Sequence, residues 1–159
     1  MTISIFIQTL NEEQNLPGLL ESVSWADDIV VLDSLSTDRT REISEAAGAR
    51  WFERPYDGRG NHQNWAMENI EFKHRWVFYL DADERMTPEL RAEIEKIASE
   101  WESGARSIEK NDPVAYYGGR RNIYKGKWLK NAMPPGNIMR FFQPPRIRFA
   151  RDANPIPIV

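Results

Sequence analysis

The chain has 159 residues, 41% hydrophobic and 28% charged, which is the size and balance typical of one globular domain. Its formal net charge is −3, and no basic face large enough to bind nucleic acid is evident in the sequence. The lack of Cys excludes disulfides, thiolate zinc sites and cysteine nucleophiles. No apolar run approaches the roughly 18 residues of a membrane span, and no signal peptide is evident, so we expect a cytoplasmic protein without a transmembrane segment.

Short apolar strands alternate with helices in the first two thirds of the chain. Residues 2–9 are typical of a buried strand, and apolar residues then recur at helical spacing over 16–23. A second strand ends at Asp33, and Ser36 or Thr37 is expected to cap the helix that follows.

The same alternation continues to residue 104. Residues 49–53 indicate a weaker strand, and 58–60 indicate a flexible glycine-rich loop before a third helix. The strongest strand signal, 75–80, leads to a helix that Thr87 and Pro88 open. The pattern predicts an α/β fold with an open, mostly parallel sheet flanked by helices.

The pattern changes after residue 104 to extended segments over 114–129, 138–142 and 146–149. We expect these segments to add antiparallel strands to the sheet in the C-terminal third. The Pro-rich ending from Asn154 closes no element in this interpretation, and we expect the sequence to stop short of where a full-length domain would end.

Acidic residues follow three of the predicted strands. Glu12 and Glu13 follow the first strand, Asp33 ends the second, and Asp81 and Asp83 end the fourth. The carboxyl ends of parallel strands share one edge of a sheet, where ligands bind. Two carboxylates about 4 Å apart repel by roughly 4 kcal/mol at an effective dielectric near 20, so such a cluster favours a bound cation.

The Asp-Ala-Asp segment carries the most information about chemistry, and it has two interpretations. On a loop just past a strand, Asp81 and Asp83 could hold a ribose hydroxyl and a hard cation, leaving positions on the cation for phosphate oxygens. In the alternative, residues 81–84 are a solvated turn that leads to the Thr87 cap.

Other candidate motifs are weaker. No glycine follows the first strand, so the phosphate-binding turn of a dinucleotide-binding fold is missing. His62 and His74 have no second ligand at metal spacing and are interpreted as surface or packing residues. Trp128 lies in a Lys-rich stretch, where it either packs or stacks on a sugar.

Three segments together resemble a known family. Residues 9–13, 31–38 and 79–84 resemble, in order and at suitable intervals, the family 2 glycosyltransferases of the GT-A fold. The likeness is closer to the bacterial branch that builds lipopolysaccharide core and related surface glycans, where a Gly-Lys-Trp-Leu-Lys stretch like 126–130 also occurs. The resemblance covers roughly residues 1–142.

The resemblance implies a reaction and its partners. A single GT-A-like domain over 1–159 would comprise a nucleotide-sugar-binding half at 1–104 and an acceptor-side half at 105–159. It would transfer a sugar from a nucleoside diphosphate sugar, with a UDP-sugar favoured, to a glycan or lipid-linked acceptor, with inversion. Mg²⁺ or Mn²⁺ would be the cofactor, and the inner face of the cell membrane a site of peripheral association.

The resemblance also implies roles for individual residues. Asp81 and Asp83 would hold the metal, and Asp83 would act directly at the diphosphate. The pocket for the nucleotide sugar would be lined by Thr9, Asn11, Glu12, Asp33, Arg59, Asn64, Asp81 and Ala82. The acceptor side would include Asn122, Lys127 and Trp128.

Two departures from the family pattern leave alternatives open. Gln63 stands where relatives often carry a cation for the diphosphate, and Arg59 could supply that charge instead. The acid that serves as base in the family is not visible after the late strands, and beyond Phe149 only Asp152 could serve. The chain could therefore be a non-catalytic or incomplete sugar-nucleotide-binding domain. A phosphohydrolase with Asp81 as nucleophile and Asp83 as acid and base is the other alternative.

Overall fold

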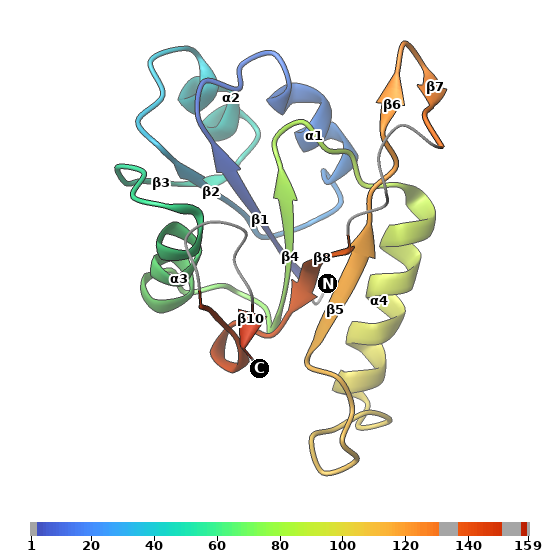
Figure 1. The fold of residues 1–159 in the computed structure, drawn as a ribbon. Helices are drawn as coiled ribbons and strands as arrows, with labels where there is room; N and C mark the ends of the chain where they lie inside the picture. The colour runs from blue at the N-terminus through green and yellow to red at the C-terminus, as the bar shows by residue number, and fades with distance from the viewer. Residues whose placement is uncertain (1–2, 131–136, 151–156, 159) are drawn as a thin grey trace.

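The computed structural model describes residues 3–130, 137–150 and 157–158 (Figure 1). Its centre is a six-stranded sheet with strand order β3-β2-β1-β4-β8-β5. These strands are β1 (Ile3–Thr9), β2 (Ile29–Asp33), β3 (Arg50–Glu53), β4 (Trp76–Asp81), β5 (Ala115–Gly119) and β8 (Asn137–Phe142). The helices are α1 (Leu16–Ser22), α2 (Thr40–Ala46), α3 (Arg59–Asn69), α4 (Pro88–Glu102) and the 3-10 turn η1 (Pro144–Arg146).

The first four strands are parallel, as the alternation of strands and helices predicts. β1 is central and pairs in parallel with both β2 and β4, and β2 pairs in parallel with β3. β8 is antiparallel to β4, and β5 is antiparallel to β8, so β5 runs in the same direction as β4. The expected mostly parallel sheet with antiparallel strands from the C-terminal third is confirmed.

Two short hairpins lie outside the main sheet, which corrects the expectation that all late strands join it. β6 (Ile123–Tyr124) pairs with β7 (Lys127–Trp128), and β9 (Arg148–Phe149) pairs with β10 (Pro157–Ile158). The expectation that the Pro-rich ending closes no element is therefore wrong at Pro157–Ile158. The Pro-Pro-Gly segment before β8 lies outside the described residues.

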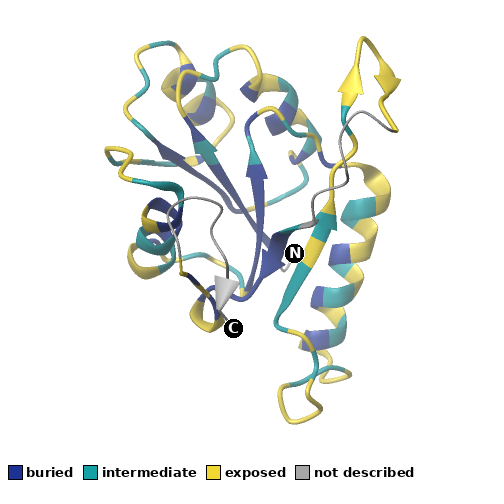
Figure 2. Ribbon diagram, in the orientation of Figure 1, coloured by how far each residue is buried: buried dark blue, intermediate teal, exposed yellow. Residues whose placement is uncertain are grey.

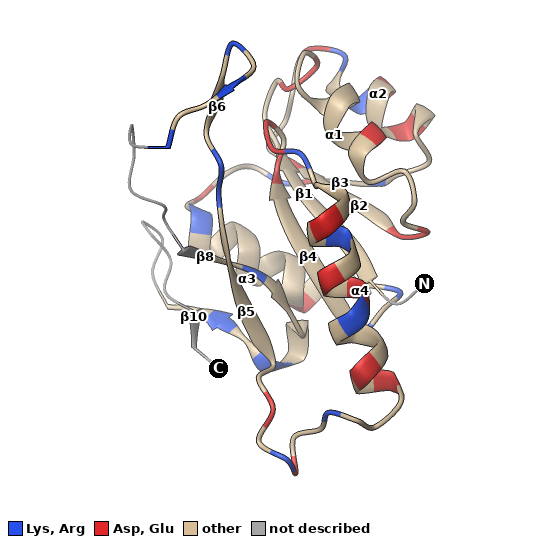
Figure 3. Ribbon diagram, turned by 90° about the vertical axis from the view of Figure 1, so that its right-hand side faces the viewer, with Lys and Arg blue, Asp and Glu red and all other residues tan. Residues whose placement is uncertain are grey.

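Successive side chains of the strands point to opposite faces of the sheet and pack into two hydrophobic clusters, one on each face; the buried strands are dark blue in Figure 2. Ile5 packs with residues of α1 and α4, whereas Phe6 points to the opposite face and packs with residues of α3. Trp76 stacks on Phe141 with ring centroids 4.5 Å apart, which fastens β4 to β8. Acidic residues recur along α4, as its red segments in Figure 3 show, with a smaller number of basic ones between them.

Helix starts agree with the sequence in one case and differ in two. Thr87 caps α4 as expected, because its side chain accepts a hydrogen bond from the Leu90 N–H at 3.2 Å. α2 begins only at Thr40, so the expected cap at Ser36 or Thr37 is wrong. The predicted flexible loop at 58–60 is also wrong, since α3 starts at Arg59 after Gly58 turns the chain with a φ of 115° that favours glycine.

Within the described ranges, no helix combines the length and apolar character that spanning a bilayer requires.

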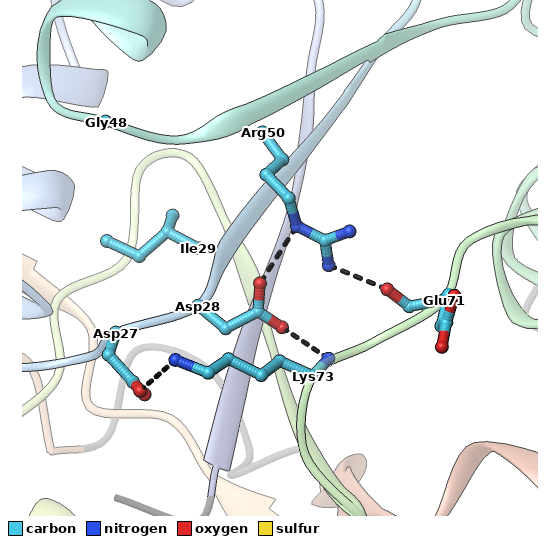
Figure 4. Close-up of a pocket in the computed structure, with 7 residues that line it drawn as sticks. All are labelled: Asp27, Asp28, Ile29, Gly48, Arg50, Glu71 and Lys73. Atoms are coloured by element: carbon cyan, nitrogen blue, oxygen red, sulfur yellow. Dashed lines mark hydrogen bonds and ion pairs between the residues drawn. The ribbon is translucent and has the colours of Figure 1, made fainter.

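A cluster of charged residues lies at the end of the sheet that is opposite to the carboxyl ends of the parallel strands (Figure 4). It borders a cavity of about 340 Å³. Asp28 is 5% exposed and accepts hydrogen bonds from the Ser4 hydroxyl, from Arg50 Nε at 3.0 Å and from the Lys73 N–H at 2.9 Å. One buried carboxylate therefore connects the starts of β1 and β3 with the loop before β4.

Asp28→Ala should lower the free energy of unfolding by about 3 kcal/mol, because it removes the shared acceptor of three donors in a buried position. Urea unfolding followed by circular dichroism measures the loss. Asp27→Ala is the matched control, because the exposed Asp27 carboxylate pairs with Lys73 and His74 at the surface. Equal losses in the two variants would contradict the role given to Asp28.

Candidate functional site

Two acidic strand ends lie side by side at one edge of the sheet. In the parallel register, Thr9 of β1 is opposite Asp33 of β2, and Gln8 of β1 is opposite Asp81 of β4. The expectation that the acidic strand ends share one edge is therefore confirmed. The loops that follow β1, β2 and β4 form the candidate site.

The loop after β2 is organised by Asp33. This carboxylate is 1% exposed and accepts hydrogen bonds from Thr9 Oγ1, from Ser36 Oγ and from the Ser36 N–H, each at 2.6 Å. Ser36 is committed to Asp33, which explains why it does not cap α2. Both oxygens of Asp33 accept from the protein itself, so the structure gives this residue an organising role.

The loop after β1 is tied to the loop after β2 by side chains of both. Asn11, with a φ of 54°, donates its N–H to Ser36 Oγ at 2.7 Å and accepts from the Thr37 N–H at 2.9 Å. The Glu12 N–H donates to Thr40 Oγ1 at 2.8 Å. The two loops thus form one cross-linked wall of the site, with Asn11 exposed and Glu12 half-buried on it.

Asp81 forms the centre of a second group of charges. Its carboxylate accepts hydrogen bonds from the Tyr79 hydroxyl, from Arg140 Nη2 at 2.9 Å and from Arg59 Nη2 at 3.3 Å. Arg140 comes from β8, is 4% exposed, and also donates to Glu84 Oε1 at 2.6 Å. Glu84 Oε2 in turn accepts the Asp81 N–H at 2.9 Å, so Arg140 holds two acids that the turn after β4 brings together.

The surroundings shift the pKa values of the two carboxyl groups in opposite directions. Burial alone would raise the pKa of Asp81, but Arg140, the Tyr79 hydroxyl and Arg59 outweigh it and hold that pKa below its usual range. Burial raises the pKa of Glu84, and Arg140 offsets this only in part. At neutral pH the cluster therefore contains an ionised Asp81 surrounded by cations.

Asp83 differs from Asp81 in its surroundings. It is exposed, and within the described part of the chain its carboxylate has no hydrogen bond or ion pair in the structure. A hard cation fits this chemistry, because Mg²⁺ is commonly held by one or two carboxylates and completes its shell with phosphate oxygens and water. Over residues 3–130 and 137–150 no three His, Asp or Glu converge into a cage, so a bound cation would need ligands from a partner such as a diphosphate.

Comparison with known families decides the membership of this chain. The model of the family described as "Glycosyl transferase family 2" matches residues 4–155. The chain belongs to glycosyltransferase family 2. Its sheet and flanking helices are the GT-A fold that the sequence motifs imply.

Individual relatives cover the chain in part. It is 41% identical over 96 residues to an uncharacterized glycosyltransferase of Rickettsia bellii and 35% identical over 96 residues to the lipopolysaccharide core biosynthesis glycosyltransferase LpsC of Rhizobium meliloti. These matches cover 60% and 57% of this chain and 32% and 35% of the relatives, so the chain spans about a third of their length. The crystal structure of S. aureus TarS 1-349 in complex with UDP is similar in fold, with a TM-score of 0.53, 24% identity, and coverage of 63% of this chain and 32% of that one.

The remaining predicted residues of this family 2 domain are divided between the site and its surroundings. Arg59 lies at the site, whereas Gln63 is 3% exposed within α3 and does not present a side chain to a ligand at the surface. Ala82 is buried. The Asn64 amide bonds both the N–H and the C=O of Phe149, at 2.8 and 2.9 Å, so it connects α3 to β9.

Three further predicted residues lie on the β6–β7 hairpin, and one cannot be placed. Lys127 and Trp128 are exposed on β7, and Asn122 accepts the Leu129 N–H at the hairpin base. Asp152 lies outside the described residues. His62 is buried as a packing residue, and burial together with Arg54 lowers its pKa.

Sequence reasoning missed Arg140 and Glu84. The available signal for Arg140 was a single cation inside the apolar run Ile138–Phe142, where a charge is costly unless it is paired. Glu84 was read only as part of the acidic turn.

Arg140→Gln should destabilise the fold by about 3 kcal/mol at neutral pH, because it leaves Asp81 and Glu84 without their buried partner. Without Arg140 the pKa of Glu84 rises further above its usual range and that of Asp81 is lowered less, so the folded variant binds more protons than the folded parent and the stability deficit shrinks as the pH falls. Urea unfolding at several pH values measures this. Arg148→Gln, which breaks only the exposed ion pair with Glu68, should be neutral throughout. A pH-independent deficit in Arg140→Gln would refute the pairing.

Proposed function

We propose that this chain is a glycosyltransferase domain that moves a sugar from a nucleoside diphosphate sugar, with UDP as the favoured nucleotide, to a glycan or lipid-linked acceptor with inversion. The observation that carries the proposal is the contrast at the end of β4. Asp81 is neutralised by Arg140 and Arg59, whereas Asp83, two residues later, is exposed and forms no side-chain hydrogen bond or ion pair within the described residues. Family membership supports the same reaction class.

The proposed donor site divides the nucleotide between two groups of residues. The wall built by Thr9, Asn11, Glu12 and Asp33 would bind the nucleoside, with Asp33 holding the loop in shape. Asp81 would face the ribose, and Asp83 would hold Mg²⁺ or Mn²⁺ at the diphosphate. A divalent cation there supplies positive charge where the leaving nucleoside diphosphate becomes more negative.

The chain's own cations would contribute to the same step. The Arg59 side chain is 36% exposed and reaches Asp81 and the Tyr79 hydroxyl, so it has solvent access from a fixed position. A guanidinium there can donate to a phosphate oxygen as the bond from the anomeric carbon to the diphosphate breaks. The acceptor hydroxyl that attacks this carbon must lose its proton to a base, and Asp152 is the candidate within this sequence.

The C-terminal half of the chain is proposed to bind the acceptor. The 105–159 half, including Asn122, Lys127 and Trp128, would face the acceptor. The similarity to LpsC, a lipopolysaccharide core biosynthesis glycosyltransferase, supports a cell-envelope glycan as acceptor and a place for this protein at the cytoplasmic face of the membrane. The UDP of the TarS complex makes UDP the first nucleotide to test.

The competing functions differ from this proposal in measurable ways. A phosphohydrolase would need a free nucleophilic carboxylate, yet Asp81 is shared by Arg140, Arg59 and Tyr79. A non-catalytic domain would bind the nucleotide sugar without turning it over. Release of UDP from UDP-sugars, measured alongside hydrolysis of p-nitrophenyl phosphate, separates the three.

Asp83→Asn should remove the dependence of UDP binding on Mn²⁺, because it withdraws the free carboxylate proposed to hold the cation. Titration calorimetry of UDP with and without Mn²⁺ measures this. Glu93→Gln, which neutralises an exposed acid of α4, is the matched control and should bind UDP as the parent does. The metal assignment fails if Asp83→Asn keeps the Mn²⁺ dependence of the parent.

Asp33→Ala should weaken binding of uridine alone by about tenfold, the scale of one lost hydrogen bond, because the wall loses its central acceptor. Ser36→Ala, which removes one tie of that wall to Asp33 and to Asn11, should give a smaller loss in the same direction. Uridine affinity measured by titration is the readout, with circular dichroism to confirm folding. Unchanged affinity in a folded Asp33→Ala protein would argue against a nucleoside role for the wall.

A further inference from the structure

The hairpin formed by residues 120–130, which we call the basic hairpin, extends away from the body of the domain (Figure 1). Four large hydrophobic side chains on it are exposed, at 60% for Ile123, 62% for Tyr124, 48% for Trp128 and 38% for Leu129. Nine such side chains are exposed in the described part of the chain, so nearly half of them are concentrated here. Exposed apolar groups gathered at one place indicate an interaction surface.

The charge of the chain is divided along its length, which the net value of −3 conceals. Residues 1–112 contain 12 Lys and Arg with 23 Asp and Glu, whereas residues 113–159 contain 9 and 1. Five of those cations are in the basic hairpin, which has no acid, and Figure 3 shows blue segments on this hairpin and none in red. The prediction that no basic face is large enough to bind nucleic acid rests on the net charge and does not consider this division.

Cations and aromatic rings are interleaved on the basic hairpin. Arg121 and Lys130 each lie 5.0 Å from the centroid of the Trp128 ring, and Lys125 lies 5.6 Å from that of Tyr124. Exposed Trp and Tyr with adjacent Lys and Arg are the side chains that favour the boundary between lipid headgroups and acyl chains. The cations over Trp128 also compete with stacking of a neutral sugar on that ring.

The hairpin lies at the edge of the sheet that carries the candidate site. β5 runs in the direction of β4, so the chain leaves both strands at the same edge. At the hairpin base Arg120 Nη1 is 4.0 Å from Glu84 Oε1, next to Asp81. A surface bound by the hairpin would therefore lie beside the acidic strand ends.

We propose that the basic hairpin docks this protein on an anionic phospholipid bilayer, with the cations contacting headgroup phosphates and Tyr124 and Trp128 entering the interface. A second copy of the chain is disfavoured because two such hairpins repel each other. Nucleic acid would engage the cations but leave Ile123 and Leu129 in water. This inference rests on the membrane association included in the proposed function. Its test uses no nucleotide, sugar or metal, so a failure of membrane docking can be distinguished from a failure of the proposed sugar transfer.

The test measures binding of the full chain to vesicles by co-sedimentation. The chain should bind phosphatidylcholine vesicles that contain phosphatidylglycerol, fail to bind phosphatidylcholine alone, and dissociate as salt is raised. Arg121→Gln/Lys125→Gln/Lys130→Gln should lower the partition coefficient by about a hundredfold, because each cation near an anionic surface contributes about fivefold. The control Arg39→Gln/Lys96→Gln/Arg148→Gln loses the same charge at side chains exposed by 71%, 76% and 67% and should bind as the parent does.

A second measurement reports insertion of the aromatic ring. Brominated phosphatidylglycerol should quench part of the tryptophan emission of the parent, and Trp128→Phe should lose that quenching although five other Trp remain. Equal effects of the two triple variants, or quenching unchanged in Trp128→Phe, would overturn the proposal. So would dimerisation through the hairpin, or a preference for duplex DNA over the anionic vesicles.

Discussion

The candidate site depends on one guanidinium placed among carboxylates. The turn after β4 brings Asp81 and Glu84 together, and without a cation their proximity inside the domain would be costly. Arg140 reaches both from β8, and β8 is held in place by the stacking of Phe141 on Trp76. The antiparallel strands of the C-terminal third thus complete the charge balance of an edge built by the N-terminal parallel strands.

This arrangement separates the tasks of two neighbouring acids. Asp81 is surrounded by donors and is part of the framework, whereas Asp83 is exposed and has no side-chain partner within the described residues. A similar division occurs after the first two strands, where buried Asp33 fixes the loop and exposed Asn11 lies on its surface. In both places an acid held by several hydrogen bonds, buried Asp33 and half-buried Asp81, lies next to a segment that presents an exposed polar residue.

Much of the fold and part of the site could be predicted from the sequence, because the hydrophobic periodicity of a segment and the residues at the end of a strand are local signals. The alternation of strands and helices, the Thr87 cap and the shared edge of Asp33 and Asp81 all follow from such signals. The failures involve partners outside the pattern that gave each prediction. Ser36 fits a helix cap, but its hydroxyl donates to Asp33 three residues earlier and accepts the N–H of Asn11 from another loop. Arg140 is an unexpected charge in a strand until the fold brings Asp81 and Glu84 to it. The pairing of Pro157–Ile158 with β9 likewise has no local signature.

The separation of Arg140 from its partners also bears on how the domain assembles. Asp81 and Arg140 are 59 residues apart in the sequence, whereas β1 and β2 are joined by a single short helix. Closing the longer loop costs more chain entropy, so the parallel half can form while β8 is still unpaired. During that interval Asp81 and Glu84 lack their common cation, and no contact with Arg140 stabilises the final shape of the turn between them. The edge that carries the candidate site is therefore expected to be the last part of the sheet to become ordered.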